Sequence, residues 1–210
     1  MIRTLSLIKR RPDITRDAFR DHYETVHAPL ALPYMEGLER YVRYHLEAER
    51  LGEVGFDVIS AFWYRDAEST AKLMEILASD EGKPILEDEL TFMDKPANRF
   101  FPVSERLLVD GEEGDVHDWI LVRKPEALDR SEASKVLVRD HLPGLLKACD
   151  GLRFALLRDA FPVAGGEIPY NAVLQVGSDG VVGLDAWAAK LEDEAWGVAA
   201  VRTRRHETSL

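Results

Sequence analysis

Cysteine is nearly absent from this chain of 210 residues, in which Cys149 stands alone. A lone thiol cannot form an internal disulfide, and without a cysteine cluster the common structural zinc sites are excluded. Basic residues are also in deficit, because 27 Lys and Arg stand against 38 Asp and Glu and give a formal net charge of −11. Nucleic acids and anionic membranes both attract clustered positive charge, so neither is an expected partner.

Long apolar runs are missing as well. No stretch approaches the roughly 18 apolar residues that suggest a transmembrane helix, and the opening run Met1–Leu5 is too short and polar for a signal peptide. The sequence lacks the glycine-rich loops that hold phosphates and the Gly-x-Ser-x-Gly elbow, and Gly165–Gly166 is typical of a loop tip between strands. We therefore expect a cytoplasmic protein.

What the sequence does contain is an internal repeat. Three short segments recur 114 positions further on (141 − 27 = 114), namely His27 with His141, Gly37 with Gly151, and Asp57–Ile59 with Asn171–Val173. Between the two copies, residues 109–118 carry two glycines among five acidic residues, which is typical of a linker. The predicted domains are therefore residues 1–108 and residues 118–210.

Each half predicts the element order β-α-β-β-α-β. The first half predicts strands over 2–9, 38–46, 56–64 and 99–107, helices over 15–28 and 66–78, and a short extra helix within 80–98. The second half predicts strands over 118–123, 152–161, 170–176 and 198–206 and helices over 130–147 and 181–191. Thr15 is the expected N-cap of the first helix, and Pro29 is expected to end or kink that helix at Ala28.

This element order predicts the fold class. Two ferredoxin-like repeats of this order form antiparallel sheets with helices on one face only. The other face of each sheet must be buried against a second sheet. We therefore predict an α+β fold in which the sheets pair as an α+β barrel with an interior cavity.

Several motifs of the first half belong together. They are the turn Lys9–Pro12, the helical segments Phe19–Tyr23 and His27–Pro29, the strand start Gly37–Tyr41, and the acidic and aromatic stretch Asp88–Asp94. Together they resemble the EthD family, clearly over residues 1–108 and faintly over 118–210. The resemblance implies a dimeric α+β barrel, close to cofactor-free monooxygenases and muconolactone-type isomerases. EthD-like members include dehydratases or decarboxylases of aromatic polyketides, so the fold alone does not settle the reaction.

His27 is the first candidate for a catalytic residue. At a helix end, where the helix meets the sheet, an imidazole titrates near neutral pH and can both give and take a proton. The alternative is a structural histidine that bonds a backbone carbonyl. Tyr23 lies one turn earlier, so the two side chains can touch. His22 and His27 are five residues apart and are expected to point in different directions, so no metal clasp is predicted, and Glu87–Glu89 is expected to be a solvated helix face.

Further side chains of the first half could line an apolar cavity with a few polar groups. Alternation places Tyr41, Arg43 and His45 on one face of the second strand. The alternative is that the aromatic side chains only fill the core. The predicted substrate-binding residues are Tyr41, His45, Phe62, Trp63 and Phe101. Of the polar candidates only the histidine is retained in the second half, as His141, which either serves a second pocket or ends its helix, and we favour the latter.

These observations predict a cofactor-independent lyase, a dehydratase or decarboxylase of a small aromatic or polyketide-like substrate. His27 is its expected acid and base, with Tyr23 beside it, and neither a metal nor another cofactor is expected. Two alternatives stay open, a non-catalytic small-molecule-binding or auxiliary protein of a catabolic pathway, and a cofactor-free monooxygenase or haem binder. A homodimer is expected, because Trp187 and Trp196 are aromatic surface that a second chain could cover.

Overall fold

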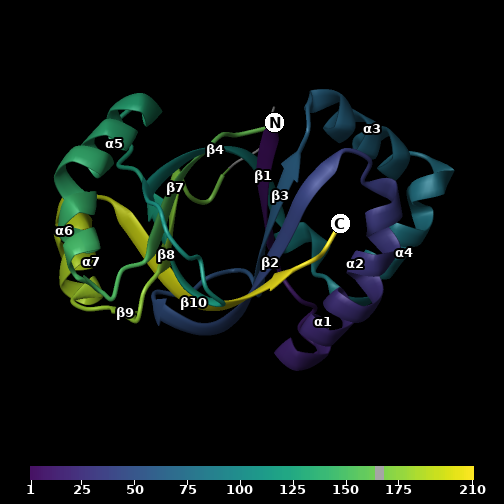
Figure 1. Ribbon diagram of the computed structural model, residues 1–210, viewed down its shortest axis with the longest axis horizontal. Coiled ribbons are helices and arrows are strands. Elements are labelled where there is room, and N and C mark those ends of the chain that lie inside the picture. Colours follow the sequence, from purple (N-terminus) through teal and green to yellow (C-terminus); the bar gives the residue numbers. More distant parts are fainter. Residues whose placement is uncertain (164–167) are drawn as a thin grey trace. The chain divides into compact units, whose positions relative to one another are not determined.

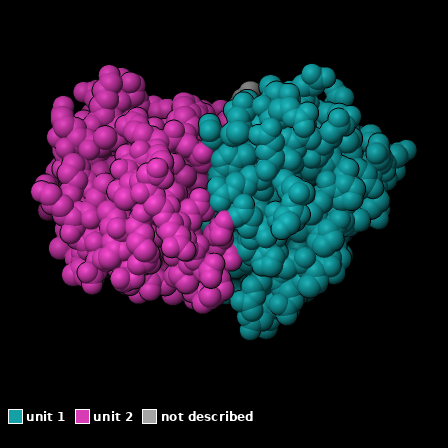
Figure 2. Space-filling view, in the orientation of Figure 1, with its two compact units in different colours: residues 1–45, 55–100, 206–210 teal, residues 46–54, 101–205 magenta. Residues whose placement is uncertain are grey.

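The computed structural model describes residues 1–163 and 168–210, and the chain forms two compact units (Figure 2). Unit 1 contains residues 1–45, 55–100 and 206–210, and unit 2 contains residues 46–54 and 101–205. The chain therefore passes from one unit to the other several times. The proposed boundaries of the two repeats, 1–108 and 118–210, remain a prediction, and Gly165–Gly166 lie outside the described residues.

The first half of the chain has the predicted element order, with its helices on one side of its strands (Figure 1). The predicted extra helix of the insert is present as α4. The elements are β1 (Ile2–Ile8), α1 (Arg16–His22), η1 (Tyr23–His27), α2 (Ala28–Ala31), η2 (Leu32–Tyr34), β2 (Leu38–Leu51), β3 (Val58–Tyr64), α3 (Ala67–Leu77), η3 (Asp80–Gly82), α4 (Lys83–Phe92), η4 (Lys95–Ala97) and β4 (Arg99–Val109).

The second half repeats this order and adds a small two-stranded sheet, β6 with β9, that the sequence did not predict. The elements are β5 (Val116–Arg123), α5 (Arg130–Val136), η5 (Leu137–His141), α6 (Leu142–Lys147), β6 (Cys149–Asp150), β7 (Phe154–Ala160), β8 (Ala172–Gly177), β9 (Gly180–Val181), α7 (Leu184–Asp193) and β10 (Gly197–Glu207).

The strand pairing within each unit is antiparallel. In unit 1, β3 is the central strand, and its Val58 lies opposite Ile8 of β1 and opposite His45 of β2. In unit 2, β5 pairs with β10 and β8, and β7 pairs with β8 and β4. Antiparallel strands that alternate with helices in this order confirm the predicted α+β fold class.

Each unit buries a core between its helices and its sheet. In unit 1 the core is aromatic and contains Phe19, Tyr23, Phe62 and Phe92. In unit 2 it is largely aliphatic and also contains Trp187 and Trp196, which are only 9% and 4% exposed. The two tryptophans are therefore covered within their own unit and do not supply the exposed aromatic surface expected of them.

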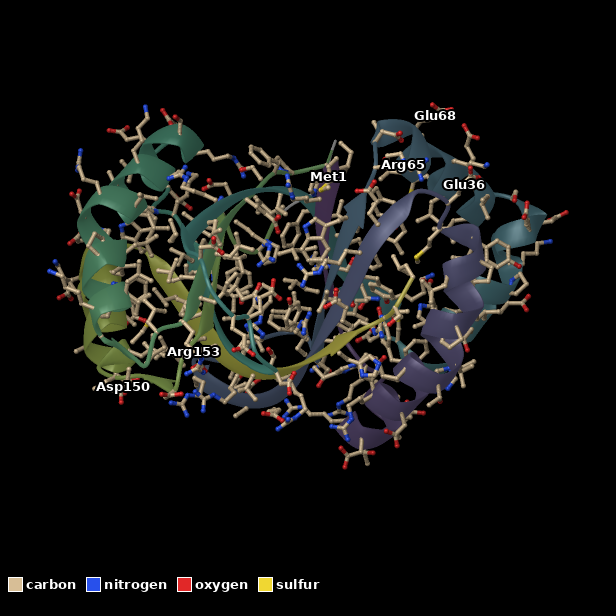
Figure 3. The ribbon with its side chains drawn as sticks, in the orientation of Figure 1. Met1, Glu36, Arg65, Glu68, Asp150 and Arg153 are labelled. Atoms are coloured by element: carbon tan, nitrogen blue, oxygen red, sulfur yellow. The ribbon has the colours of Figure 1, made fainter. Side chains whose placement is uncertain are left out.

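The glycine turns of the repeat adopt the same backbone conformation in both halves. Gly37 and Gly151 have φ values of +77° and +56°, a region that favours glycine because it lacks a Cβ. A Cβ at Gly37 would collide with the Ser69 side chain, and one at Gly151 would collide with Asp179. The residues that flank these turns, such as Glu36 and Asp150, lie at the surface of their units (Figure 3).

Candidate functional site

The candidate site of unit 1 begins with an unusual turn in its first helical segment. Thr15 is the N-cap as predicted, since its side chain accepts a hydrogen bond from the backbone N–H of Ala18. The helical path does not end at Ala28 but widens into the π-helical turn η1, in which the N–H of Ala28 bonds the carbonyl of Tyr23 five residues earlier. Pro29 follows directly and has no N–H to continue the usual pattern. Such π-turns often occur at functional sites.

The π-turn brings His22 and His27 to the same acidic residue. His22 Nε2 lies 2.8 Å from Asp88 Oδ1, and His27 Nδ1 lies 2.8 Å from Asp88 Oδ2. The expectation that residues five apart would point in different directions is wrong, because the five-residue repeat of a π-turn aligns them. The expectation of a solvated face at 87–89 is also wrong for Asp88, whose side chain is only 11% exposed.

The contact with Asp88 sets the chemistry of His27. A carboxylate can only accept hydrogen bonds, so Nδ1 of His27 carries the proton and Nε2 of the neutral ring is left as a base. Nε2 has no hydrogen-bond partner within residues 1–163 and 168–210. Burial lowers the pKa of His27 below its ordinary value, although Asp88 and Glu89 act in the opposite direction. His27 is therefore a neutral base with one nitrogen available.

Tyrosine hydroxyls form a chain beside His27. The Tyr41 hydroxyl donates to the Tyr23 hydroxyl at 2.9 Å, and the Tyr23 hydroxyl shares a hydrogen bond of 3.0 Å with Ser60 Oγ. The rings of Tyr23 and His27 meet edge to face, with centroids 5.2 Å apart. Burial raises the pKa of both Tyr23 and Tyr41, so both phenols remain protonated hydrogen-bond donors at neutral pH. The predicted proximity of Tyr23 to His27 is thus observed.

A second buried acid, Glu24, organises the polar residues of β2. Arg43 binds its carboxylate through Nε and Nη2, and His45 Nε2 lies 2.5 Å from Oε1. Burial would raise the pKa of Glu24, but hydrogen bonds from His45 and Arg43 outweigh it and bring the pKa to about 2. His206 Nε2 adds a third contact, 2.9 Å from Oε2. Glu24 therefore remains ionised and fixes both β2 side chains.

The remaining predicted site residues have different surroundings. Phe62 stacks on Tyr41, with ring centroids 4.5 Å apart. Trp63 lies on the opposite face of the sheet, because adjacent strand residues point to opposite sides, and there it contacts Arg40. Phe101 is fully buried and belongs to unit 2. The structure thus groups Tyr23, His27, Tyr41, His45 and Phe62, and it does not add Trp63 to this group.

Sequence reasoning missed Asp88 and Glu24 as members of the site. Asp88 is 61 residues from His27, so only the three-dimensional fold brings the two together. One signal was available for Asp88, since it opens the acidic and aromatic stretch that resembles the EthD family. Glu24 had the weaker signal of being a charged residue directly after the candidate Tyr23.

In unit 2, His141 occupies the position of His27 in a second π-turn, and the N–H of Leu142 bonds the carbonyl of Leu137. His141 Nε2 lies 3.2 Å from Glu194 Oε2, and its ring meets Trp196 edge to face at 5.6 Å. Tyr23, Tyr41 and Ser60 correspond at this offset to Leu137, Ala155 and Leu174, all of which are buried. The hydroxyl chain is therefore replaced by apolar packing.

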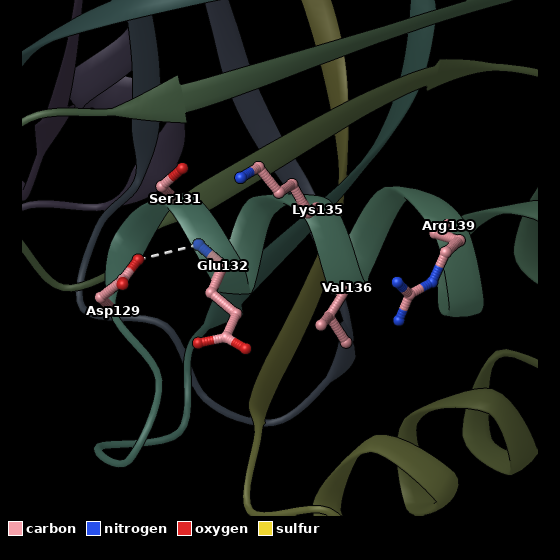
Figure 4. Close-up of a pocket in the computed structure, with 6 residues that line it drawn as sticks. All are labelled: Asp129, Ser131, Glu132, Lys135, Val136 and Arg139. Carbon is pink, nitrogen blue, oxygen red and sulfur yellow. Dashed lines mark hydrogen bonds between the residues drawn. The ribbon is translucent and has the colours of Figure 1, made fainter.

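Unit 2 also carries a surface pocket of about 350 Å³ along α5 (Figure 4). Six residues line it, Asp129, Ser131, Glu132, Lys135, Val136 and Arg139. Asp129 serves there as the N-cap, since its side chain accepts from the N–H of Glu132 at 2.8 Å. The guanidinium of Arg139 is paired with Asp140. Asp129 and Arg139 thus have local partners, and none of the predicted site residues lines the pocket.

Within the described residues, we find neither a candidate metal-binding cluster nor a candidate membrane-spanning helix. Within residues 1–163 and 168–210, no three His, Cys, Asp or Glu side chains are arranged to hold a metal ion. Over the same residues, no helix combines the length and the apolar character that crossing a bilayer requires.

Comparison with protein families gives a specific match. Residues 11–96 match the EthD domain. The match contains the π-turn with His27 and the acidic stretch with Asp88, so both residues of the His27–Asp88 contact lie within the matched residues. The resemblance inferred from the first half of the sequence is thereby confirmed. Among curated proteins, none matches the chain.

Several solved structures are similar to the chain, and two of them, with TM-scores above 0.5, share its fold. An anthrone oxidase-like protein is 13% identical over 100% of this chain and 94% of its own, with a TM-score of 0.62. A chlorite dismutase mutant from Candidatus Nitrospira defluvii is 12% identical over 96% of this chain and 90% of its own, with a TM-score of 0.51. An EthD family protein from Bacillus halodurans is 27% identical over 49% of this chain and 96% of its own, with a TM-score of 0.37. Some proteins with this fold thus carry the names of enzymes, but neither of these two names indicates a lyase.

Proposed function

We propose that the protein is a cofactor-independent lyase that dehydrates or decarboxylates a small aromatic or polyketide-like substrate. The observation that carries the proposal is the contact between His27 Nδ1 and Asp88, 2.8 Å long and largely buried, which leaves Nε2 as the base. A buried histidine held by a carboxylate in one tautomer is a common arrangement for general acid–base catalysis.

The residues have separate roles in a dehydration. Nε2 of His27 removes a proton from the carbon next to a carbonyl, and Asp88 stabilises the imidazolium that forms. The same proton then passes from Nε2 to the departing hydroxyl, so that a carbon–carbon double bond forms and water leaves. Tyr23 donates its phenolic hydrogen to the substrate carbonyl in place of Ser60. Burial of the pair strengthens these interactions because bulk water is excluded.

A screen by mass spectrometry tests the reaction class. Aromatic acids and hydroxylated polyketide-like compounds are incubated with the protein, and the expected result is loss of water or of carbon dioxide from one of them. If His27→Gln converts the substrate at the same rate as the wild-type protein, the proposed role of His27 is refuted. Conversion of none of these compounds would favour the auxiliary-protein function instead.

A cofactor-free monooxygenase is the second candidate function. It is favoured by the similarity to the anthrone oxidase-like protein, whose TM-score of 0.62 exceeds that of the other two structures compared above. The base that starts a dehydration can also deprotonate a phenol, and the resulting anion can react with molecular oxygen. An oxygen electrode separates the two functions, because only the monooxygenase consumes oxygen in step with substrate.

The expected partners are a small-molecule substrate and a second copy of the chain. Burial of Trp187 and Trp196 within unit 2 removes one argument for the homodimer. Exposed apolar side chains of the same unit, Leu107, Phe161 and Val163, are 51%, 40% and 46% exposed and offer other surface for a second chain. Light scattering at micromolar concentration should show a particle of twice 23.7 kDa, and a particle of 23.7 kDa would exclude the dimer.

A further inference from the structure

His22 is a third member of the histidine–aspartate contact that the proposed reaction does not use. Its side chain is 29% exposed, whereas those of Asp88 and His27 are 11% and 7% exposed. Its ring packs on Phe92 of α4, with centroids 4.5 Å apart, and its Nε2 faces Asp88 Oδ1. The two histidines thus occupy the two oxygens of one carboxylate.

This sharing constrains how Asp88 can orient. A carboxylate held by one histidine alone can rotate about its Cβ–Cγ bond and turn toward water, which breaks its single hydrogen bond. With His22 bound at Oδ1, rotation would break two hydrogen bonds at once. Oδ2 is therefore held toward His27 Nδ1, 2.8 Å away.

We infer that His22 is a positioning residue, which acts through Asp88 to keep His27 in the tautomer with a proton on Nδ1 and a bare Nε2. The inference rests on the proposed function only for its effect on turnover, since the tautomer is a property of the resting protein. It matters because free imidazole prefers no single nitrogen strongly, and the partner of one nitrogen decides which carries the proton.

A purely structural role for His22 does not explain the arrangement. Unit 2 forms the same π-turn with Val136 at the position of His22, since 22 + 114 = 136. There the acid near His141 is Glu194, which follows α7, whereas Asp88 lies within α4, the extra helix of the first half. The turn therefore forms without a histidine at this position, and the shared carboxylate is a feature of unit 1 alone among the two π-turns.

Two variants separate hydrogen bonding from packing. His22→Gln retains an amide N–H about where Nε2 lies and can still donate to Asp88. His22→Leu retains apolar packing on Phe92 and loses the donor. Should His22→Leu fail to fold, His22→Asn replaces it, because its amide is too short to reach Asp88 from the same backbone position.

Nitrogen-15 NMR of histidine-labelled protein measures the tautomer without any substrate. In the wild type and in His22→Gln, the expected His27 signals are those of a protonated Nδ1 and a bare Nε2. In His22→Leu, or in His22→Asn, a comparable population with the proton on Nε2 should appear. His141 is the internal control and should not change in any variant. A His27 tautomer that is unchanged in the folded donor-less variant would overturn the inference.

Turnover distinguishes this inference from the proposed function. Once a substrate is found, His22→Leu should lower kcat by roughly 10-fold with little change in KM, and His22→Gln should restore most of the loss. Wild-type rates in His27→Gln would refute the proposed function, whatever the NMR shows. A large loss in His27→Gln together with wild-type rates and tautomer in His22→Leu would refute only the role of His22.

Discussion

Units 1 and 2 build their first helical segment and its turns alike but fill the space beneath the helices differently. Thr15 is the N-cap of α1 and Asp129 is the N-cap of α5. Each helix then continues into a π-turn that is followed by a proline. Under that turn, unit 1 places a network of hydroxyl, carboxylate, guanidinium and imidazole groups. At the corresponding positions, unit 2 places three leucines, one alanine and one valine, which are Leu137, Leu157, Leu174, Ala155 and Val138.

This difference shows which residues of unit 1 the fold does not require. Arg43 corresponds to Leu157 (43 + 114 = 157) and Glu24 to Val138 (24 + 114 = 138), so the buried ion pair of unit 1 is replaced by two aliphatic side chains. A buried ion pair is often no more stabilising than well-packed apolar residues, because both charges lose their hydration. The network of unit 1 is thus not needed to form this architecture, which is consistent with a role in binding or catalysis.

The largest expected effect comes from breaking that ion pair on one side. Arg43→Leu leaves the Glu24 carboxylate buried with histidine partners only, and we expect a loss of about 3–5 kcal/mol in the free energy of unfolding. The double variant Glu24→Val with Arg43→Leu copies unit 2 and should recover most of the loss. Urea denaturation measures both. A double variant as unstable as Arg43→Leu would show that unit 1 depends on the pair for its fold.

Acid should destabilise unit 1 through Glu24. Its pKa falls from 4.5 to about 2 on folding, so it stabilises the folded state above pH 4.5. That contribution, at most roughly 3 kcal/mol, is lost as the pH falls from 4.5 toward 2, because the unfolded chain binds the proton more readily. Denaturation at a series of pH values should show a smaller drop over this window in the Glu24→Val, Arg43→Leu variant. Equal drops in both proteins would assign the acid sensitivity to other groups.

Matched substitutions in the two π-turns compare the two histidines. His27→Gln should lower turnover by roughly 10²-fold or more, the usual size of a lost general acid or base, while leaving the fold intact. His141→Gln should change turnover little. Steady-state kinetics and circular dichroism on both variants provide the measurement. Similar losses in the two variants would mean that the units do not differ in their role.

Removing the phenol of Tyr23 should have the smallest effect. Tyr23→Phe keeps the ring beside His27 but removes the hydroxyl that bonds Ser60 and Tyr41. We expect kcat to fall by about 10-fold, less than for His27→Gln, because a single orienting hydrogen bond is lost. Steady-state kinetics measures the loss, and an unchanged kcat would show that the Tyr23 hydroxyl does not orient the substrate.

The repeat could be predicted from the sequence because it rests on local signals. The glycine turns need a left-handed residue, the strands alternate, and the helix starts carry capping side chains, so all three recur at one offset. The π-turn could not be predicted as such, since a five-residue widening of a helix leaves the apolar pattern almost unchanged. Pro29 indicated only that the helix ends or kinks near Ala28. The contact of Asp88 with the two histidines could not be predicted for a different reason, because they are 61 and 66 residues away in the sequence.

Residues 206–210 belong to unit 1, although most of β10, which runs to Glu207, belongs to unit 2. His206 contacts Glu24, Glu207 pairs with Arg40, and the N–H of Thr208 bonds the carbonyl of Tyr41. A ribosome makes Tyr41 more than 160 residues before it makes Thr208 (208 − 41 = 167). While those residues are being synthesised, the carbonyl of Tyr41 lacks its hydrogen bond from Thr208, and Glu24 lacks its contact with His206. The candidate site is therefore completed only after the 167 residues that follow Tyr41 have been synthesised.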